Sequence, residues 1–295
     1  MRDPFAARAF DAGTRGPVGV DTERPSLPRV QDYWRRGRDN YDADRAFCTG
    51  LAQIAPGWPD VMRMGRLWRE RVVRYLAGPA GIRQFVELGA GFPAMRDTHS
   101  IAQEFGRPAV VVYLDHDPVV TIHGRVLLGG YPRSHFERAD ITDPGRVLDV
   151  IGEHVDLRQP VALLAAGILP HIGGDVDPGT LMRTYIDALA PGSHVALTHF
   201  LAPHDGASHH SLAADLQHRY LTGLGSGWFR SRDAILGLFH GVELIEPGLV
   251  PLDQWWPLGP AVGLSPPEQR LVVGGVGAKT DSLTERVVAL SQWRR

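Results

Sequence analysis

The sequence predicts a doubly wound α/β protein with a mostly parallel, seven-stranded sheet and an N-terminal helical cap. Apolar stretches of strand length alternate with segments of helical period, a glycine turn follows the first stretch, and acidic residues follow the second and third. Alternating strands and helices are typical of parallel sheets with right-handed crossovers. The 295 residues suffice for one large domain or two small ones.

The first 80 residues precede the predicted sheet. Residues 1–28 are rich in Arg, Asp, Gly and Pro without an apolar period, so we expect a flexible leader. A short helix, a break at Gly37 and a second helix from near Asp42 follow, and apolar residues between Asp60 and Leu76 recur at helical spacing. We interpret residues 29–80 as a helical cap over a cofactor site and residues 81–295 as one Rossmann-like domain.

Seven strands are expected in the remaining chain. The first five lie at 84–88, 110–114, 134–138, 161–166 and 194–200, with helical segments between them. Ser231 is placed to cap a helix that runs through Phe239. Short strands at 242–245 and 271–276 complete the sheet.

Composition excludes several classes of protein. The formal net charge of −2 gives no sign of a nucleic-acid footprint, and no apolar run is long enough for a membrane span. Cys48 is the single cysteine, which rules out intramolecular disulfides and a cysteine-based zinc cluster. The N-terminus lacks the apolar core of a signal peptide. We therefore expect a cytoplasmic protein without nucleic-acid or membrane partners.

The turn after the first strand has the character of a nucleoside-cofactor site. Gly89, Gly91 and Ala94 match the G-x-G-x-x-A spacing of nicotinamide dinucleotide sites, but so short a pattern has little specificity. Glu87 stands inside the strand, where such sites normally carry an apolar residue. Pro93 removes a backbone N–H that a pyrophosphate would need.

S-adenosylmethionine (SAM) fits these residues better than a dinucleotide. SAM has no phosphate and carries positive charge, so an acid beside the glycine turn is favourable. Asp115 ends the second strand, where it can bind ribose hydroxyls, and Asp140 follows the third. Taken singly, a strand-end aspartate is usually a cap or turn former. The ordered set resembles class I SAM-dependent methyltransferases, in which the acid after the third strand meets the adenine amino group.

A second segment narrows the resemblance to one family. Arg38–Tyr41 and Ala43–Arg45 are similar to the signature G-[KR]-D-N-[FY]-x-A-D-R of a SAM-methyltransferase family that is abundant in actinobacteria and mostly unassigned in substrate. The likeness covers roughly residues 28–277. It implies that this segment packs over the cofactor pocket, with Arg38 and Asn40 holding the methionine carboxylate; a capped surface helix is the alternative. The other cofactor residues that it implies are Glu87, Gly89, Gly91, Asp115, His116, Asp140, Ile141, Ala166 and Gly167.

Methyl transfer mainly requires that the acceptor atom be positioned behind the methyl group, sometimes with a general base. The candidates among thirteen histidines are His171 and His199, because they follow the fourth strand and end the fifth, with Tyr33 as an aromatic of the cap. His204, Asp205, His209 and His210 lack the fixed spacing of zinc motifs, so we expect no metal.

The leading hypothesis is a methyltransferase for a small-molecule acceptor, in specialised metabolism, that forms a homodimer. The chain departs from its relatives at Ala94–Arg96 and at Pro170, where the acceptor would lie. A SAM-binding protein without methyl transfer, either a regulator or a SAM-assisted cyclase, is therefore the alternative. A nicotinamide-dependent oxidoreductase is a third hypothesis, which Glu87 and Pro93 disfavour.

Overall fold

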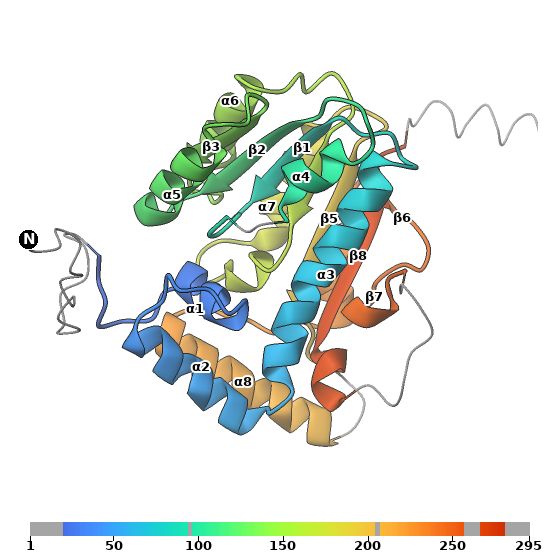
Figure 1. Cartoon of the computed structure of the whole chain (residues 1–295). Coiled ribbons are helices and arrows are strands. Elements are labelled where there is room, and N and C mark those ends of the chain that lie inside the picture. Colours follow the sequence, from blue (N-terminus) through green and yellow to red (C-terminus); the bar gives the residue numbers. More distant parts are fainter. Residues whose placement is uncertain (1–19, 94–95, 204–206, 257–265, 281–295) are drawn as a thin grey trace, which may run out of the picture.

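A computed structural model describes residues 20–93, 96–203, 207–256 and 266–280. Its centre is one mixed sheet whose strands lie in the order β3-β2-β1-β4-β5-β8-β6, with β7 paired to β8 (Figure 1). The five parallel strands are β1 (Gln84–Leu88), β2 (Val110–Asp115), β3 (Ser134–Arg138), β4 (Ala162–Ala165) and β5 (His194–Phe200). The antiparallel strands are β6 (Glu243–Leu244), β7 (Val250–Pro251) and β8 (Val272–Ala278).

The strand order reverses between β1 and β4, which places the ligand crevice at their carboxyl ends. In this class of sheet, ligands bind where neighbouring crossovers leave in opposite directions. Phe85 pairs with Ala162 across the β1–β4 boundary, and with Val111 across the β1–β2 boundary. The glycine turn after β1 therefore lies between the turns after β2 and β4.

Helices cover both faces of the sheet because alternate strand residues are apolar on each side. Phe85, Val111 and Ala196 belong to one core cluster with α3, whereas Val86, Val112 and Val195 belong to the other. The covering helices are α3 (Trp58–Ala77), α4 (Thr98–Gln103) and α5 (Pro118–Leu128) beside the first cluster, and α6 (Pro144–Gly152), α7 (Pro178–Asp187) and α9 (Arg232–Gly237) beside the second.

A layer of helices crosses the carboxyl ends of the strands. It consists of α1 (Leu27–Trp34), α2 (Asp42–Ile54) and α8 (Ala207–Leu224), with α1 between the sheet and the other two (Figure 1). Three 3₁₀ turns complete the fold: η1 (Leu169–His171), η2 (Leu252–Gln254) and η3 (Pro267–Leu271). None of the helices in the described ranges is long and apolar enough to cross a membrane.

The predicted α/β fold is confirmed, with three differences. The sheet has an eighth strand, β7, which is too short to leave a period in the sequence. The helical layer begins at Leu27, and α8 belongs to it through its packing on α2, whereas much of α3 covers the sheet. Part of the predicted flexible leader is held in place, because the Ser26 N–H donates to Asp44 Oδ1 at 3.0 Å. Residues 1–19 lie outside the described ranges.

Candidate cofactor and acceptor site

The turn after β1 depends on two glycines. Gly89 and Gly91 have φ values of +65° and +67°, a region that L side chains rarely adopt. A Cβ on Gly89 would lie 2.5 Å from Ile168 Cγ1, and one on Gly91 would lie 3.3 Å from Gln31 Oε1. The missing side chains therefore let the backbone approach the turn after β4 on one side and the cap helix α1 on the other.

Asp115 joins the end of β2 to this turn. Its Oδ2 accepts the Gly91 N–H at 2.9 Å, and its Oδ1 accepts the Asp117 N–H at 3.0 Å. Burial raises the pKa of the carboxyl, and the two backbone donors only partly offset that effect. Each carboxylate oxygen has two lone pairs, so each retains one for a hydroxyl donor. Asp115 therefore has free acceptor positions at the end of β2, and its contact with ribose hydroxyls stays a prediction.

The turn after β3 contributes a third acid. Asp140 is exposed, and its Oδ1 accepts both the backbone N–H and the hydroxyl of Thr142, at 2.9 and 2.8 Å. Partial burial acts to raise the Asp140 pKa, but these hydrogen bonds outweigh it and lower the pKa. Ile141 is buried and its carbonyl accepts the Tyr185 hydroxyl at 2.7 Å. His116 is exposed, with its Nδ1 3.9 Å from Asp115 Oδ1.

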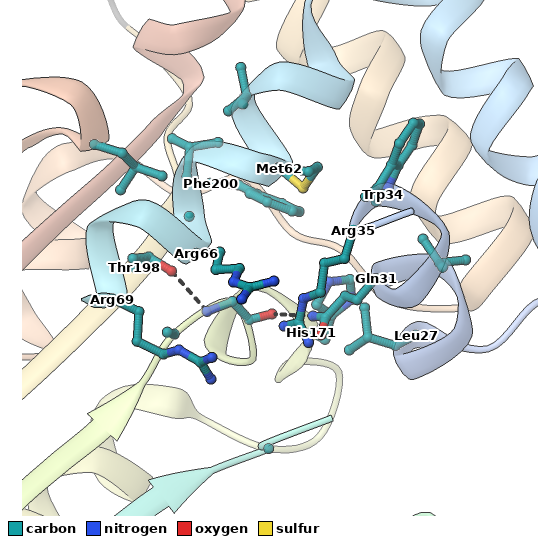
Figure 2. A pocket seen from close by; sticks show the side chains of 18 of the residues that line it. Leu27, Gln31, Trp34, Arg35, Met62, Arg66, Arg69, His171, Thr198 and Phe200 are labelled. Carbon is teal, nitrogen blue, oxygen red and sulfur yellow. Dashed lines mark hydrogen bonds between the residues drawn. The ribbon is translucent and has the colours of Figure 1, made fainter. Parts of the chain in front are cut away.

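A cavity lies between the cap and the carboxyl ends of β1, β4 and β5, and its described lining residues do not include Asp115 or Asp140. Its apolar walls come from α1, α3, β5, α8, η2 and β8, and they include Trp34, Met62, Phe200 and Tyr220. Gln31 and Arg35 reach it from α1 and the residue that follows it, and Arg66 and Arg69 reach it from α3 (Figure 2). Gly89, Ala166 and Gly167 form part of its floor. The predicted cofactor turns after β1 and β4 therefore open on a partly enclosed cavity with largely apolar walls.

Two polar side chains from the cap lie against this floor. Gln31 Nε2 donates to the Gly167 carbonyl at 3.5 Å, and Arg35 Nη1 donates to the Phe92 carbonyl at 3.3 Å. Burial and the charge of Arg69 lower the pKa of Arg35 to about 10, so its guanidinium stays charged at neutral pH. Sequence reasoning missed both residues. The spacing of Leu27, Gln31 and Arg35, which puts them on one helical face, could have indicated them.

Glu87 is not a free acid beside the turn. Arg69 Nη1 donates to Glu87 Oε2 at 2.9 Å, and Arg69 Nη2 donates to Asp97 Oδ1 at 3.0 Å. The Thr98 hydroxyl donates to Glu87 Oε1. Burial acts to lower the Arg69 pKa, but the two carboxylates outweigh it and raise the pKa. Glu87 therefore fixes the back of the turn through a buried ion pair, although it also lines the cavity.

His171 brings an uncharged imidazole to the cavity. Its Nδ1 lies 2.9 Å from Ser226 Oγ, and its ring contacts Phe200 and Tyr220 edge-on at centroid distances of 5.8 and 5.7 Å. Burial, with a smaller effect of His199, lowers the pKa of His171 to about 3. The ring is neutral near pH 7 and is a weak base. Nearby, Thr198 Oγ1 accepts the Gly167 N–H at 2.8 Å (Figure 2).

Comparison with known proteins agrees with this arrangement. A family model described as S-adenosyl methyltransferase matches residues 14–280. The chain belongs to the S-adenosyl methyltransferase family. SAM is the cofactor of this family, which confirms the cofactor prediction and excludes the nicotinamide hypothesis.

Solved structures support the same family. A "putative methyltransferase" from Thermobifida fusca is 35% identical, covers 90% of this chain and 98% of that chain, and superposes with a TM-score of 0.84. A DUF574 family protein from Streptomyces avermitilis is 31% identical, covers 88% and 99%, and gives a TM-score of 0.81.

A curated relative from Mycobacterium ulcerans, named "putative S-adenosyl-L-methionine-dependent methyltransferase", is 29% identical over 190 residues, 61% of this chain and 52% of the relative. A relative of the same name from Mycobacteroides abscessus is 34% identical over 152 residues, 46% of this chain and 44% of the relative. The matches span about half the length of these curated relatives.

Two residues predicted to act on the acceptor do not line the cavity. His199 is fully buried: Arg230 Nη1 donates to its Nε2 at 2.8 Å, and its Nδ1 donates to the Phe200 carbonyl at 2.9 Å. Both ring nitrogens are therefore occupied. Tyr33 lines a separate groove on the outer side of α1. His171 is the predicted catalytic residue that the fold brings to the cavity.

Arg38 and Asn40, predicted to hold the methionine carboxylate, also lie away from the cavity. Arg38 is exposed along the same outer groove as Tyr33. Asn40 is buried, and its Nδ2 donates to Asp32 Oδ2 at 2.8 Å and to the Gly37 carbonyl at 3.1 Å. Local hydrogen bonds therefore use the polar groups of Asn40, and α1 rather than this segment covers the cofactor turns.

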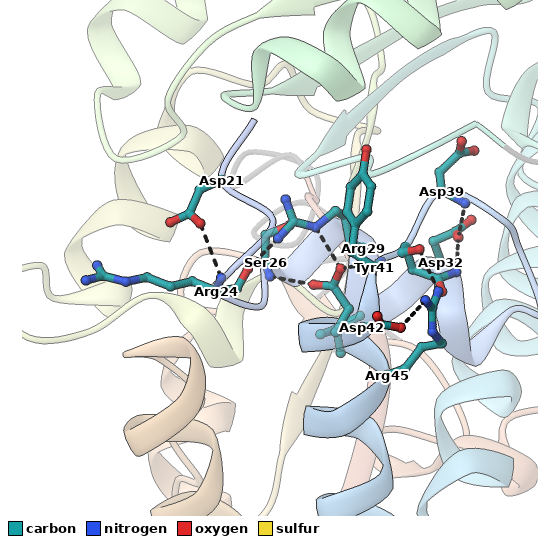
Figure 3. A network of polar contacts seen from close by, with 12 residues as sticks. Asp21, Arg24, Ser26, Arg29, Asp32, Asp39, Tyr41, Asp42 and Arg45 are labelled. Carbon is teal, nitrogen blue, oxygen red and sulfur yellow. Dashed lines mark hydrogen bonds and ion pairs between the residues drawn. The ribbon is translucent and has the colours of Figure 1, made fainter. Parts of the chain in front are cut away.

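The family signature instead holds α1 in position (Figure 3). Asp44 is fully buried and accepts three donors: the Ser26 N–H at 3.0 Å, Arg29 Nε at 2.8 Å and the Tyr41 N–H at 2.8 Å. Arg45 Nη1 donates to the carbonyl and side-chain oxygens of Asn40 at 2.8 and 3.0 Å. These contacts join both ends of α1 to the start of α2, and so fix Gln31 and Arg35 over the glycine turn.

The histidine-rich segment before α8 is only partly described. His209 and His210 lie on α8, whereas His204 and Asp205 lie outside the described ranges. Within those ranges, no group of three or more His, Cys, Asp and Glu side chains could hold a metal ion.

The buried imidazole of His199 makes folding sensitive to acid. Burial is the main cause that lowers its pKa from 6.5 to about 4, so the unfolded chain binds more protons at this site between those pH values. Stability from this group is present above pH 6.5 and is lost as the pH falls toward 4. We expect the loss to be about 2 kcal/mol at pH 4.5.

Urea denaturation of the wild type and His199→Asn at pH 7 and pH 4.5 measures this loss. The difference in unfolding free energy between the two proteins should shrink by that amount at the lower pH. The exposed His240, replaced in His240→Asn, is the control and should show no such change. Equal pH dependence of wild type and His199→Asn would contradict the assignment.

Proposed function

We propose that this protein transfers the methyl group of SAM to a small-molecule acceptor bound in the cavity. The observation that carries the proposal is that the cofactor turns after β1 and β4 form the floor of a partly enclosed cavity with apolar walls and several polar groups. A cavity of this kind binds a small organic molecule by shape, and its polar groups fix the orientation of that molecule.

The residues at the strand ends fit SAM. Asp115 retains one lone pair on each carboxylate oxygen for two ribose hydroxyls, and the backbone at Gly91 carries no side chain that would obstruct a ligand. Asp140 and Ile141 lie at the next strand end, where the adenine would bind. SAM, when bound, supplies the methyl group and a thioether leaving group, so the protein's task is binding and orientation.

Arg35 is suited to the carboxylate of the methionine moiety. Its guanidinium is charged, lies at the turn that carries Gly91, and donates to the Phe92 carbonyl. A guanidinium can bind a carboxylate through two parallel hydrogen bonds. Gln31, which contacts the Gly167 carbonyl, lies beside it on the same helical face. These two residues take the role that the sequence assigned to Arg38 and Asn40.

His171 and Thr198 are suited to orient the acceptor. His171 is neutral, so its free ring nitrogen can accept a hydrogen bond from an acceptor O–H or N–H. Thr198 Oγ1 already accepts the Gly167 N–H, which leaves its own hydrogen to donate. A pKa of about 3 makes His171 a poor general base. We therefore assign it to orientation of the acceptor lone pair.

Replacement of Arg35 tests the placement of the cofactor. Arg35→Gln should weaken SAM binding about tenfold or more, because a charge-assisted contact with the carboxylate is lost. It should leave the affinity for methylthioadenosine unchanged, because that compound retains the nucleoside and lacks the carboxylate. Isothermal titration calorimetry with both compounds measures the two effects. Equal weakening of both would contradict a carboxylate contact and indicate a general disturbance of the site.

Methyl transfer itself is tested by turnover. The protein is incubated with SAM labelled in the methyl group and a panel of phenols, amines and carboxylic acids, and labelled products are separated by chromatography. A labelled product supports the methyltransferase. Tight SAM binding without any labelled product would favour the alternative of a SAM-binding regulator or a SAM-assisted cyclase.

We place the reaction in the specialised metabolism of the cytoplasm and expect a homodimer. The exposed apolar side chains of Ile122, Val126 and Leu127 on α5 support self-association. Sedimentation velocity measures the oligomeric state directly.

A further inference from the structure

A second hollow lies on the outer side of α1, between α1, α2 and the start of α3. We call it the arginine groove and define it by the residues that give it its character: Tyr33, Trp34, Arg36, Arg38, Arg45 and Arg63. No aspartate or glutamate is among its lining residues in the described ranges. Four guanidiniums line the groove, and the carboxylates that pair with two of them belong to Asp42 and Asp60 beside it.

Two of the four guanidiniums have no acidic partner in the structure as described. Arg45 pairs with Asp42 at 2.5 Å, and Arg63 pairs with Asp60. Arg36 and Arg38 are exposed and form no ion pair with any described residue. Arg36 also has a φ of +60°, a backbone conformation that is unfavourable for a residue with a side chain. The groove therefore presents two unpaired cations beside two paired ones.

Trp34 is the residue that the groove and the cavity share. Its side chain lines both hollows, so the same indole is a wall of each. Trp34 is 5% exposed, and its Nε1–H has no hydrogen-bond partner among the described residues. A buried N–H without a partner is costly, and a ligand acceptor at this wall would relieve the cost. The adjacent Tyr33 ring, 5.6 Å from that of Trp34, adds an aromatic surface.

We propose that the arginine groove binds the oxyanion group, phosphate or carboxylate, of the methyl acceptor. The proposal rests on the function proposed above, because the groove shares Trp34 with the cavity in which methyl transfer would occur. Arg36 and Arg38 bind the oxyanion, and Trp34 contacts the acceptor between this group and the part that enters the cavity. The substrate class is thus a small molecule with an apolar body and an anionic end.

The chemistry of the groove favours an oxyanion over a neutral polar group. Guanidinium groups offer several N–H donors in a planar fork that matches carboxylate and phosphate oxygens. The carboxylate of SAM is not the intended ligand, because Arg35, on the cavity side, lies at the glycine turn. Arg35 would then bind the carboxylate of SAM, and Arg36 and Arg38 would bind the oxyanion of the acceptor.

Indole resonances in ¹H–¹⁵N NMR spectra can test the proposal. The Trp34 Nε1–H signal is assigned as the one lost in Trp34→Phe. Phenyl phosphate and benzoate serve as probes of the two oxyanion sources, and phenol is the neutral control. We expect a saturable shift of the Trp34 signal with at least one oxyanion probe and none with phenol at the same concentrations. The stronger of the two probes identifies the oxyanion.

Paired arginine variants provide the control for charge. Arg36→Gln/Arg38→Gln should weaken binding of the effective probe about tenfold or more. Arg107→Gln/Arg133→Gln removes two exposed arginines that precede β2 and β3, at the opposite edge of the sheet, and should leave binding unchanged. The proposal is overturned if neither oxyanion probe shifts the Trp34 signal, if phenol is as effective, or if the first variant binds like the wild type.

A calorimetric titration of the wild-type protein with SAM tests the cofactor independently of the substrate class. If SAM fails to bind, the proposed function is wrong whatever the groove does. If SAM binds and the groove variants bind the oxyanion probe like the wild type, the substrate class is wrong while the cofactor assignment stands.

Discussion

Asp115→Asn is expected to lower the affinity for SAM by about 100-fold. The carboxylate would accept two ribose hydroxyls while it already accepts the N–H groups of Gly91 and Asp117. The asparagine amide has one carbonyl oxygen, and an NH₂ group stands where aspartate has its second oxygen. This NH₂ group would face a ribose hydroxyl or a backbone N–H, which are donors as well. Two hydrogen bonds to a charged group contribute about 1.5–3 kcal/mol each, so a loss of this size is conservative. Calorimetric titration with SAM measures it.

Asp156→Asn is the matched control for this prediction. Asp156 is also an acid at the start of a loop, but its backbone N–H is bound by Gln84 at the beginning of β1, on the opposite edge of the sheet. It should bind SAM like the wild type. Circular dichroism of both variants shows whether the sheet is intact. Wild-type SAM affinity in a folded Asp115→Asn would remove the central acid from the cofactor site.

The strand ends of this site were predictable because the residues that form each of them are close together in the sequence. An apolar strand, a glycine turn and a terminal acid are contiguous in sequence, and parallel pairing brings successive strand ends to one edge. That is why Gly89, Gly91, Asp115 and Asp140 lie at neighbouring strand ends of one edge, while their contacts with SAM stay a prediction.

The cap was not predictable in the same way. The amide of a residue such as Asn40 can form hydrogen bonds with neighbouring residues or with a ligand. The sequence does not show which of the two occurs, because this depends on the fold around the residue. The composition of α1 likewise does not tell which of its faces meets the sheet.

The sequence could not show which of the two predicted histidines faces the cavity. Both His171 and His199 are near strand ends, and that property alone selected them. Side chains alternate between the two faces along a strand, so if Thr198 and Phe200 line the cavity, His199 must point away from it. To choose between neighbouring residues of β5, one must know which face of the strand borders the cavity. That face depends on the helices packed against β5. His171 follows Pro170 and lies on the 3₁₀ turn η1, where no such alternation applies.

Asp44→Ala should lower the free energy of unfolding by about 3–5 kcal/mol. Asp44 is fully buried and accepts three donors, one of them the buried guanidinium of Arg29. Removal of the carboxylate leaves that cation and two backbone N–H groups without their acceptor, and an uncompensated buried charge is among the most costly defects in a protein. Urea denaturation at pH 7 measures the change.

Asp42→Ala, two residues before Asp44 on the same helix, provides the comparison. The Asp42 side chain is almost fully exposed in its pair with Arg45, so its removal should leave the stability nearly unchanged. A free energy of unfolding for Asp44→Ala within about 0.5 kcal/mol of the wild type would contradict the structural role of the signature.

The same pair of variants separates stability from function. If Asp44 fixes α1 over the glycine turn, the folded fraction of Asp44→Ala should also bind SAM more weakly than Asp42→Ala, because Gln31 lies on α1 and Arg35 directly follows it. Titration at a temperature well below the unfolding transition compares the two. A destabilised Asp44→Ala with undiminished SAM affinity would mean that the signature stabilises the fold without positioning the cap. In that case the contacts of Gln31 and Arg35 with the floor of the cavity would not be needed for cofactor binding.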